Sequence, residues 1–115
     1  MVKGVAFLAY SVRDVPGAIA FYRDVVGLTP GETFGEHWAE FDAGGVAFGV
    51  GNGEPLGFIP GQSTGLMFEV GDIERASARL REHGVDVSEI NDSPVCRSCF
   101  ASDPEGNRFG FHQKR

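Results

Sequence analysis

On residue type and spacing alone, the strongest chemical candidates in this chain are Cys96 and Cys99, which form a C-x-x-C pair. Such a pair is typical of half a zinc site or of a redox centre. Zinc needs two more ligands, and the chain has no second cysteine pair. A redox pair sits at a helix N-terminus, whereas residues 95–100 have a strand pattern, which sends residues three apart to opposite faces. We therefore predict two reduced structural thiols.

A sequence repeat indicates which strands and helices hold the functional groups. Residues 8–18 align with residues 66–76, and both segments predict a strand followed by an Asp that caps a helix. The identical pairs are Leu8/Leu66, Val12/Val70, Asp14/Asp72 and Ala18/Ala76. A repeat of this size indicates two copies of one supersecondary unit, neither of which buries its apolar face alone. Packed together, two such units would share a concave surface.

The strand and helix patterns extend this repeat over the whole chain. In the first copy they predict strands over 5–12, 29–34, 37–42 and 46–50, with a helix between Asp14 and Gly27. In the second copy they predict strands over 66–70, 85–90, 95–101 and 108–112, with a helix between Asp72 and Gly84. The order is βαβββ twice. We predict one domain over 1–115, made of module 1–54 and module 62–115 and joined by a loop rich in Gly and Pro.

Composition and charge narrow the class of protein. The chain has 115 residues, 42% of them hydrophobic, and a formal net charge of −6. Nucleic acids and anionic membranes both require a basic face, so neither is expected as a partner. No apolar run approaches the length of a membrane span, and the N-terminal residues lack a signal-peptide pattern. A cytoplasmic location is the expectation.

Several of these residues match a known family. The chain carries a Val-x-Asp-x-x-x-Ala-x-x-Phe-Tyr run over 12–22, Gly27-Leu28, the Asp-Pro-Glu-Gly-Asn turn at 103–107, and His112. Together they resemble the vicinal oxygen chelate superfamily, which includes glyoxalase I, bleomycin-resistance proteins, fosfomycin-resistance enzymes and extradiol dioxygenases. The resemblance implies an α+β fold in which two tandem βαβββ modules form a curled mixed sheet around a cavity, commonly in a homodimer.

The same resemblance implies where metal ligands would stand. Catalytic members place His, Glu or Gln at four strand positions, which in this chain are Phe7, Ala47, Gly65 and Gly110. None of these side chains ligates a metal. Glu36, His37 and Glu40 could imitate a metal cluster, but they fit no ligand position of the family. We expect the fold without the metal, and no cofactor.

Strand alternation then assigns a ligand-facing set. The predicted ligand-binding residues are Phe7, Ala9, Ser11, Trp38, Ala47, Met67, Glu69, Arg108 and His112. Their neighbours, predicted to face the helices and form the core, are Leu8, Tyr10, Val12, Phe68, Val70, Phe109 and Phe111. If the first and last strands of module two are neighbours, as the family implies, Glu69 and His112 form a carboxylate–imidazole pair suited to acid–base catalysis or to orienting a ligand. The alternative is a solvated strand residue and a surface histidine.

Three functions follow as hypotheses. The favoured one is a metal-independent binding protein of the glyoxalase/bleomycin-resistance type, which holds a small aromatic or cationic molecule in the cavity between its modules. The second is an enzyme, a glyoxalase-like lyase or isomerase or a dioxygenase, with an atypical metal site or with Glu69 and His112 as its acid–base pair. The third is a fold kept for protein interaction, with its cavity closed by side chains. The sequence does not identify the ligand.

Overall fold

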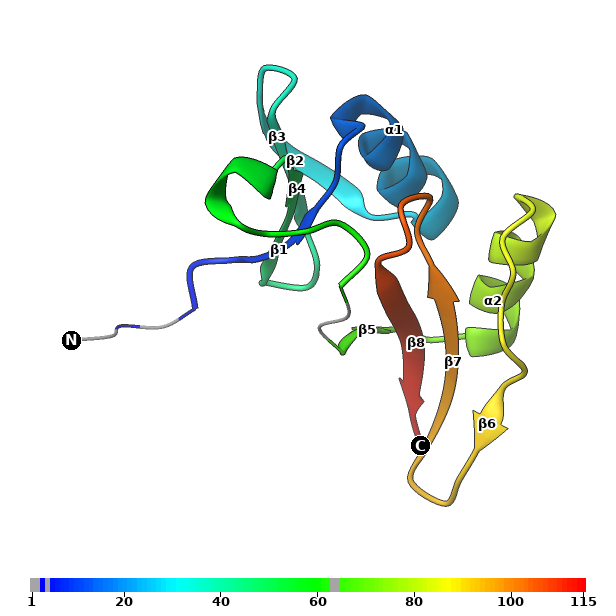
Figure 1. Cartoon of the computed structure of the whole chain (residues 1–115). Coiled ribbons are helices and arrows are strands. Elements are labelled where there is room, and N and C mark those ends of the chain that lie inside the picture. Colours follow the sequence, from blue (N-terminus) through cyan, green and yellow to red (C-terminus); the bar gives the residue numbers. More distant parts are fainter. Residues whose placement is uncertain (1–2, 4, 63–64) are drawn as a thin grey trace. The chain divides into compact units, whose positions relative to one another are not determined.

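The two aligned segments belong to two structural units of the same topology. The structure, a computed structural model, describes residues 3, 5–62 and 65–115 (Figure 1). Its internal contacts divide the chain into two compact units, Met1–Pro60 and Gly61–Arg115. Each unit has the element order strand, helix, three strands.

The first unit is a four-stranded mixed sheet with one helix. Its elements are β1 (Leu8–Ser11), α1 (Val15–Ala20), the π-helical turn η1 (Phe21–Val26), β2 (Thr29–Phe34), β3 (Trp38–Asp42), β4 (Ala47–Gly51) and the 3-10 turn η2 (Glu54–Leu56). The strand order is β1-β4-β3-β2, with β1 parallel to β4 and the other pairs antiparallel. Helix α1 contacts β3 and β4.

The second unit repeats this arrangement. Its elements are β5 (Leu66–Glu69), α2 (Ile73–Glu82), β6 (Asn91–Asp92), β7 (Cys96–Ser102) and β8 (Arg108–Lys114). The strand order is β5-β8-β7-β6, with β5 parallel to β8. Helix α2 contacts β7 and β8 (Figure 1). The predicted α+β fold of two tandem βαβββ modules is confirmed.

Both helices begin and end where the sequence predicts. Asp14 Oδ1 accepts a hydrogen bond from Gly17 N at 3.0 Å, and Asp72 Oδ1 accepts one from Arg75 N at 3.0 Å. Gly27 ends the first helical segment with φ of 90°, a left-handed conformation that a glycine adopts without strain. The first helix changes from α to π at Phe21, which the residue pattern did not predict.

Aromatic side chains form most of each core. In the first unit the rings of Tyr22 and Phe48 lie 4.9 Å apart, and both side chains are buried. In the second unit Phe109 contacts Phe68 and Phe111. The predicted core residues that are buried are Tyr10, Val12, Phe68, Phe109 and Phe111. Leu8 is 46% exposed, contrary to the prediction, because it begins an edge strand.

The predicted strand over 85–90 is wrong. This segment has no strand assignment, and the strand β6 that pairs with β7 covers only Asn91 and Asp92. Ser88 explains the difference, since its backbone N donates to Phe100 O at 2.9 Å and its hydroxyl accepts from Phe100 N at 2.8 Å. A side chain thus takes the place of a ladder hydrogen bond.

The turn at 103–107 is held by two buried polar side chains. Asp103 Oδ1 accepts hydrogen bonds from Glu105 N and Asn107 N, and Asp103 Oδ2 accepts one from Asn107 Nδ2 at 2.9 Å. Asn107 Oδ1 in turn accepts from Gly61 N at 2.8 Å. Asn107 therefore fixes the β7–β8 hairpin and ties the start of the second unit to it.

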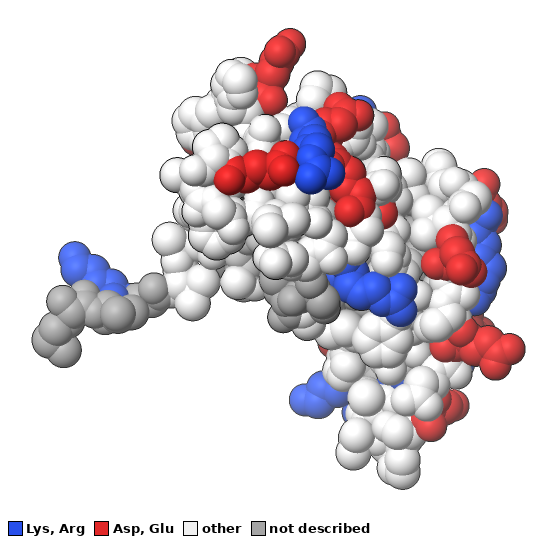
Figure 2. Space-filling model, in the orientation of Figure 1, with Lys and Arg blue, Asp and Glu red and all other residues white. Residues whose placement is uncertain are grey.

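Two surface properties bear on partners. Within the described residues, no helix is long and apolar enough to cross a membrane. On the face shown in Figure 2, acidic and basic side chains of the described residues are interspersed, and the basic ones form no continuous patch. That distribution agrees with the acidic net charge, and it gives a nucleic-acid backbone no basic surface to bind on this face.

Candidate functional site

The open face of the first unit, meaning the face of its sheet that turns away from α1, carries an aromatic platform. The indole of Trp38 lies across Gly49 and Gly51 of the neighbouring strand, and a Cβ placed on Gly49 would lie 2.3 Å from the indole. These glycines therefore let the ring lie flat on the backbone of β4. Phe7, 48% exposed, meets Trp38 edge to face with ring centroids 5.0 Å apart.

An acidic group and a second exposed ring adjoin this platform. Trp38 Nε1 donates to Glu40 Oε2 at 2.8 Å, which fixes both the indole and a carboxylate two residues along the strand. Phe34 pairs with Trp38 across strands β2 and β3 and is 55% exposed. Directly paired residues of antiparallel strands share a face, so Phe34 extends the aromatic surface. Phe34 was not among the predicted ligand-binding residues, because the face on which it lies depends on a register shift in β2.

The small residues predicted to face a ligand in the first unit pair with neighbouring strands or hold a loop. Ala9 is exposed and pairs with Gly49, and Ala47 pairs with Asp42 at the start of β4. Ser11 Oγ accepts a hydrogen bond from Gly53 N at 3.0 Å, so this hydroxyl holds the loop after β4.

The open face of the second unit, turned away from α2, holds the other predicted residues. Met67 is opposite Gly110, and a Cβ on Gly110 would lie 2.6 Å from the Met67 sulfur. The thioether thus lies where a side chain at 110 would stand. Arg108, exposed, donates to Ser102 Oγ at 3.4 Å.

Glu69 and His112 do form the predicted pair. They are opposite one another in the parallel ladder of β5 and β8, and Glu69 Oε1 lies 2.5 Å from His112 Nδ1. The second carboxylate oxygen accepts from Lys114 N at 2.8 Å. The Lys114 backbone N–H, and then the His112 hydrogen bond, hold the pKa of Glu69 below its ordinary value. The carboxylate is therefore ionised near neutral pH.

The residues present do not fit a catalytic metal. Of the four family positions, Phe7, Ala47 and the two glycines supply no donor side chain, and Met67 covers the site at Gly110. The ladders also show that Gly49, two residues beyond Ala47, is the first-unit counterpart of Gly110, since Ala9 pairs with Gly49 as Met67 pairs with Gly110. Among the described residues no group of three or more His, Cys, Asp or Glu side chains is arranged to hold a metal ion.

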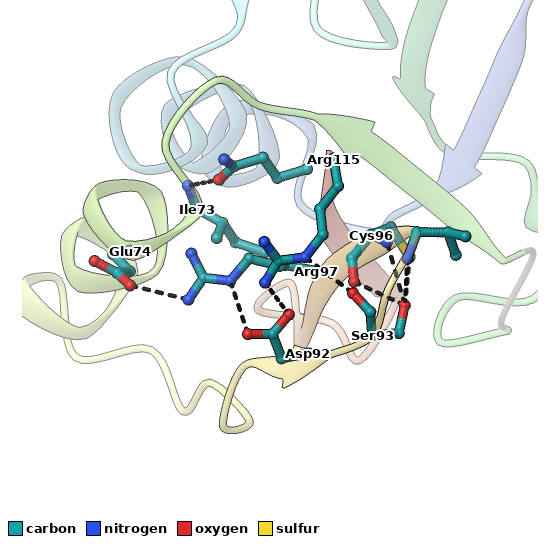
Figure 3. Close-up of polar contacts among 9 residues, drawn as sticks. Ile73, Glu74, Asp92, Ser93, Cys96, Arg97 and Arg115 are labelled. Carbon is teal, nitrogen blue, oxygen red and sulfur yellow. Dashed lines mark hydrogen bonds and ion pairs between the residues drawn. The ribbon is translucent and has the colours of Figure 1, made fainter.

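The cysteines and Arg97 belong to the structure of the second unit. Cys99 is buried, Cys96 is half-buried, and both are free thiols, as predicted. Burial raises the pKa of the Cys99 thiol, which makes it a poor nucleophile. Arg97 donates to Glu74 on α2 at 2.9 Å and lies 3.7 Å from Asp92 (Figure 3). These contacts draw its guanidinium to the helix side of the sheet.

The sequence matches known proteins over most of its length. Residues 4–111 match the family model described as Glyoxalase/Bleomycin resistance protein/Dioxygenase superfamily. The chain belongs to this superfamily. A metallothiol transferase FosB from Staphylococcus epidermidis is 29% identical to it over 97% of this chain and 84% of the relative.

Solved structures with the same fold extend the comparison. TnmS3, an antibiotic binding protein from Streptomyces sp. CB03234, matches with a TM-score of 0.85 and 28% identity over 99% of this chain and 98% of that protein. Lactoylglutathione lyase from Agrobacterium tumefaciens matches with a TM-score of 0.78 over 98% of this chain and 95% of that protein. At 20% identity the lyase shows a shared fold only. Proteins similar to this chain thus include one named as a transferase and one named as an antibiotic binding protein, so function must be argued from the site.

Proposed function

We propose that this chain is a metal-independent small-molecule-binding protein whose ligand rests on the aromatic platform of Phe7, Trp38 and Phe34. The observation that carries the proposal is an indole laid on two glycines, with a second ring against its edge. Exposed aromatic rings held in fixed positions suit a planar ligand, because little conformational entropy is lost when it stacks. The description of the similar TnmS3 as an antibiotic binding protein supports small-molecule binding.

The ligand we propose is planar, aromatic and cationic. Glu40 places a carboxylate beside the indole, and Asp42 follows on the same strand face. A cation stacked on Trp38 gains from the ring quadrupole and from these carboxylates. The net charge of −6 adds long-range attraction. We also propose that the protein is a homodimer, as the resemblance implies, and that it is cytoplasmic, as its composition and N-terminal pattern suggest.

An enzyme is the second candidate, and the Glu69–His112 hydrogen bond is the observation that favours it. A lyase or isomerase of this superfamily needs a proton acceptor, and this pair is a suitable one. The two candidates differ in what leaves the protein: a binding protein releases its ligand unchanged, whereas an enzyme releases a product. Mass analysis of the ligand after incubation separates them.

Titration with proflavine, a planar cation, tests the proposed function. Trp38 is the only tryptophan of the chain, so its fluorescence reports ligand stacking directly. We expect saturable quenching in the wild type. Calorimetry, which does not depend on the tryptophan, should show an affinity reduced about tenfold in Trp38→Ala and largely retained in Trp38→Phe. Anthraquinone sulfonate, a planar anion, should bind more weakly than proflavine, and Glu40→Gln should reduce that difference. Equal affinity of the wild type and Trp38→Ala for proflavine would show that the ligand does not bind on the aromatic platform.

A further inference from the structure

Two neighbouring rows of residues on the open face of the second unit suit a different group on a ligand. In the first row Met67, Gly110 and Phe100 are opposite one another on strands β5, β8 and β7. In the second row, two residues further along β8, Glu69, His112 and Ser98 are opposite one another. All six residues share one face of the sheet, because directly paired residues point the same way.

The second row presents a proton acceptor. Glu69 is ionised and can only accept, so the hydrogen of the 2.5 Å contact belongs to His112 Nδ1. With this hydrogen on Nδ1, the neutral imidazole has its lone pair on Nε2. Within the described residues nothing hydrogen-bonds to Nε2, and the His112 side chain is 34% exposed. The second anchor of Glu69, to Lys114 N, keeps the carboxylate and therefore the imidazole in place.

The first row presents an apolar seat for a ring. Phe100 is 39% exposed, and the half-buried Met67 lies over Gly110, so the thioether and the phenyl ring form the apolar surface of this row. Thioethers and phenyl rings both make favourable contacts with aromatic groups. The two rows are about 7 Å apart along the strand. The centre of a phenol ring lies about 5.5 Å from a hydrogen-bond partner of its hydroxyl oxygen, so one phenol reaches from the first row toward the second.

We propose that the second unit binds a ligand of the phenol class, with its ring on Met67 and Phe100 and its hydroxyl donating to His112 Nε2. This inference deepens the proposed small-molecule binding and rests on it, but it uses a different unit and different residues. The hydroxyl proton passes to Nε2, the ligand becomes a phenolate, and the imidazole becomes an imidazolium between two anions. The proton only changes place, so no oxidant or metal takes part.

One carboxylate and two cationic side chains surround His112 on this face of the sheet. Glu69 on β5 is the carboxylate that faces it, and it repels an incoming anion. On β8 the cationic residues of this face are Lys114 and Arg108. On β7 the facing residues are Ser98, Cys96 and Ser102, none of which is a carboxylate or a basic side chain. A phenol enters without charge and becomes an anion only beside the newly formed imidazolium.

The test compares meta-nitrophenol with its methyl ether, meta-nitroanisole, at neutral pH. The two share a ring, but only the phenol can donate a proton, and its phenolate absorbs in the visible. We expect the wild type to bind the phenol about tenfold more tightly than the ether and to increase the phenolate band on binding. Equal affinities, or tight binding without that band, would overturn the proposal even if no variant folds.

Variants add a second measurement. His112→Gln and Glu69→Gln should bind the phenol about tenfold more weakly and lose the phenolate band, while their affinity for the ether stays unchanged. His83→Gln, which changes an exposed histidine at the end of α2, should behave as the wild type. Retention of the band in His112→Gln contradicts the proposal. The proflavine titration tests ligand binding at the aromatic platform of the first unit separately. Failure of that proposal can therefore be distinguished from failure of phenol binding in the second unit.

Discussion

Glycines decide what the open face of each sheet carries. Gly49 and Gly51 make room for the indole of Trp38, and Gly110 makes room for the thioether of Met67. The sequence showed that Gly110 cannot ligate a metal. It could not show that another side chain already lies there, because the Met67–Gly110 contact depends on the register of two strands far apart in sequence. The Glu69–His112 pair was predictable only through the resemblance, which makes those strands neighbours.

Substitution of Gly110 tests this packing. In Gly110→Ala the new Cβ would lie 2.6 Å from Met67 and 2.7 Å from the backbone oxygen of Cys99, so the strand or the thioether must move. We expect a loss of about 1–3 kcal/mol in the free energy of unfolding, the usual cost of overpacking. Urea denaturation measures it. Gly71→Ala is the control, since no atom lies within 4 Å of its Cβ position. Equal stability of the two variants would mean that the site at Gly110 is open.

Among the elements, those with local signals were predicted best. The helices over 15–26 and 73–82 follow from an Asp cap and a left-handed Gly, both short-range features. The strand expected over 85–90 failed because Ser88 bonds to Phe100 with its side chain, a contact that no local pattern encodes. The short β6 strand beyond it is instead held by charge: Asp92 binds Arg115 at the chain end and faces Arg97 (Figure 3).

Acid should destabilise strand β6. The Arg115 hydrogen bond, and then the charges of Arg115 and Arg97, hold the pKa of Asp92 below its ordinary value. A lowered folded-state pKa gives stability that is present above the unfolded-state pKa, about 3.9 for Asp, and is lost as the pH falls through the folded-state value. Asp92→Asn should therefore have a lower urea midpoint than the wild type at neutral pH, and this difference should vanish in strong acid.

The matched control is Asp86→Asn, which changes an exposed aspartate with no ion pair among the described residues. Its urea midpoint should follow the wild type at every pH. A difference between Asp92→Asn and the wild type that persists unchanged into strong acid would show that the Asp92 charge is not what stabilises β6.

The whole molecule consists of two units with one topology and two different open faces. The repeat over 8–18 and 66–76 predicted the shared topology, because strand and cap residues recur at the same spacing. The functional difference lies in the residues that do not recur: an indole on glycines in the first unit, and a carboxylate-bound imidazole in the second. The superfamily supplies the scaffold, and these two faces carry our proposals of metal-independent binding.

Calorimetric titration of proflavine into protein treated with a chelator shows whether binding needs a metal ion. We expect saturable binding with the same affinity before and after the treatment, and no gain when Zn²⁺, Ni²⁺ or Mn²⁺ is added back, because the superfamily's metal positions hold no donor side chain. Binding that disappears with the chelator and returns with a stoichiometric metal ion would contradict the account.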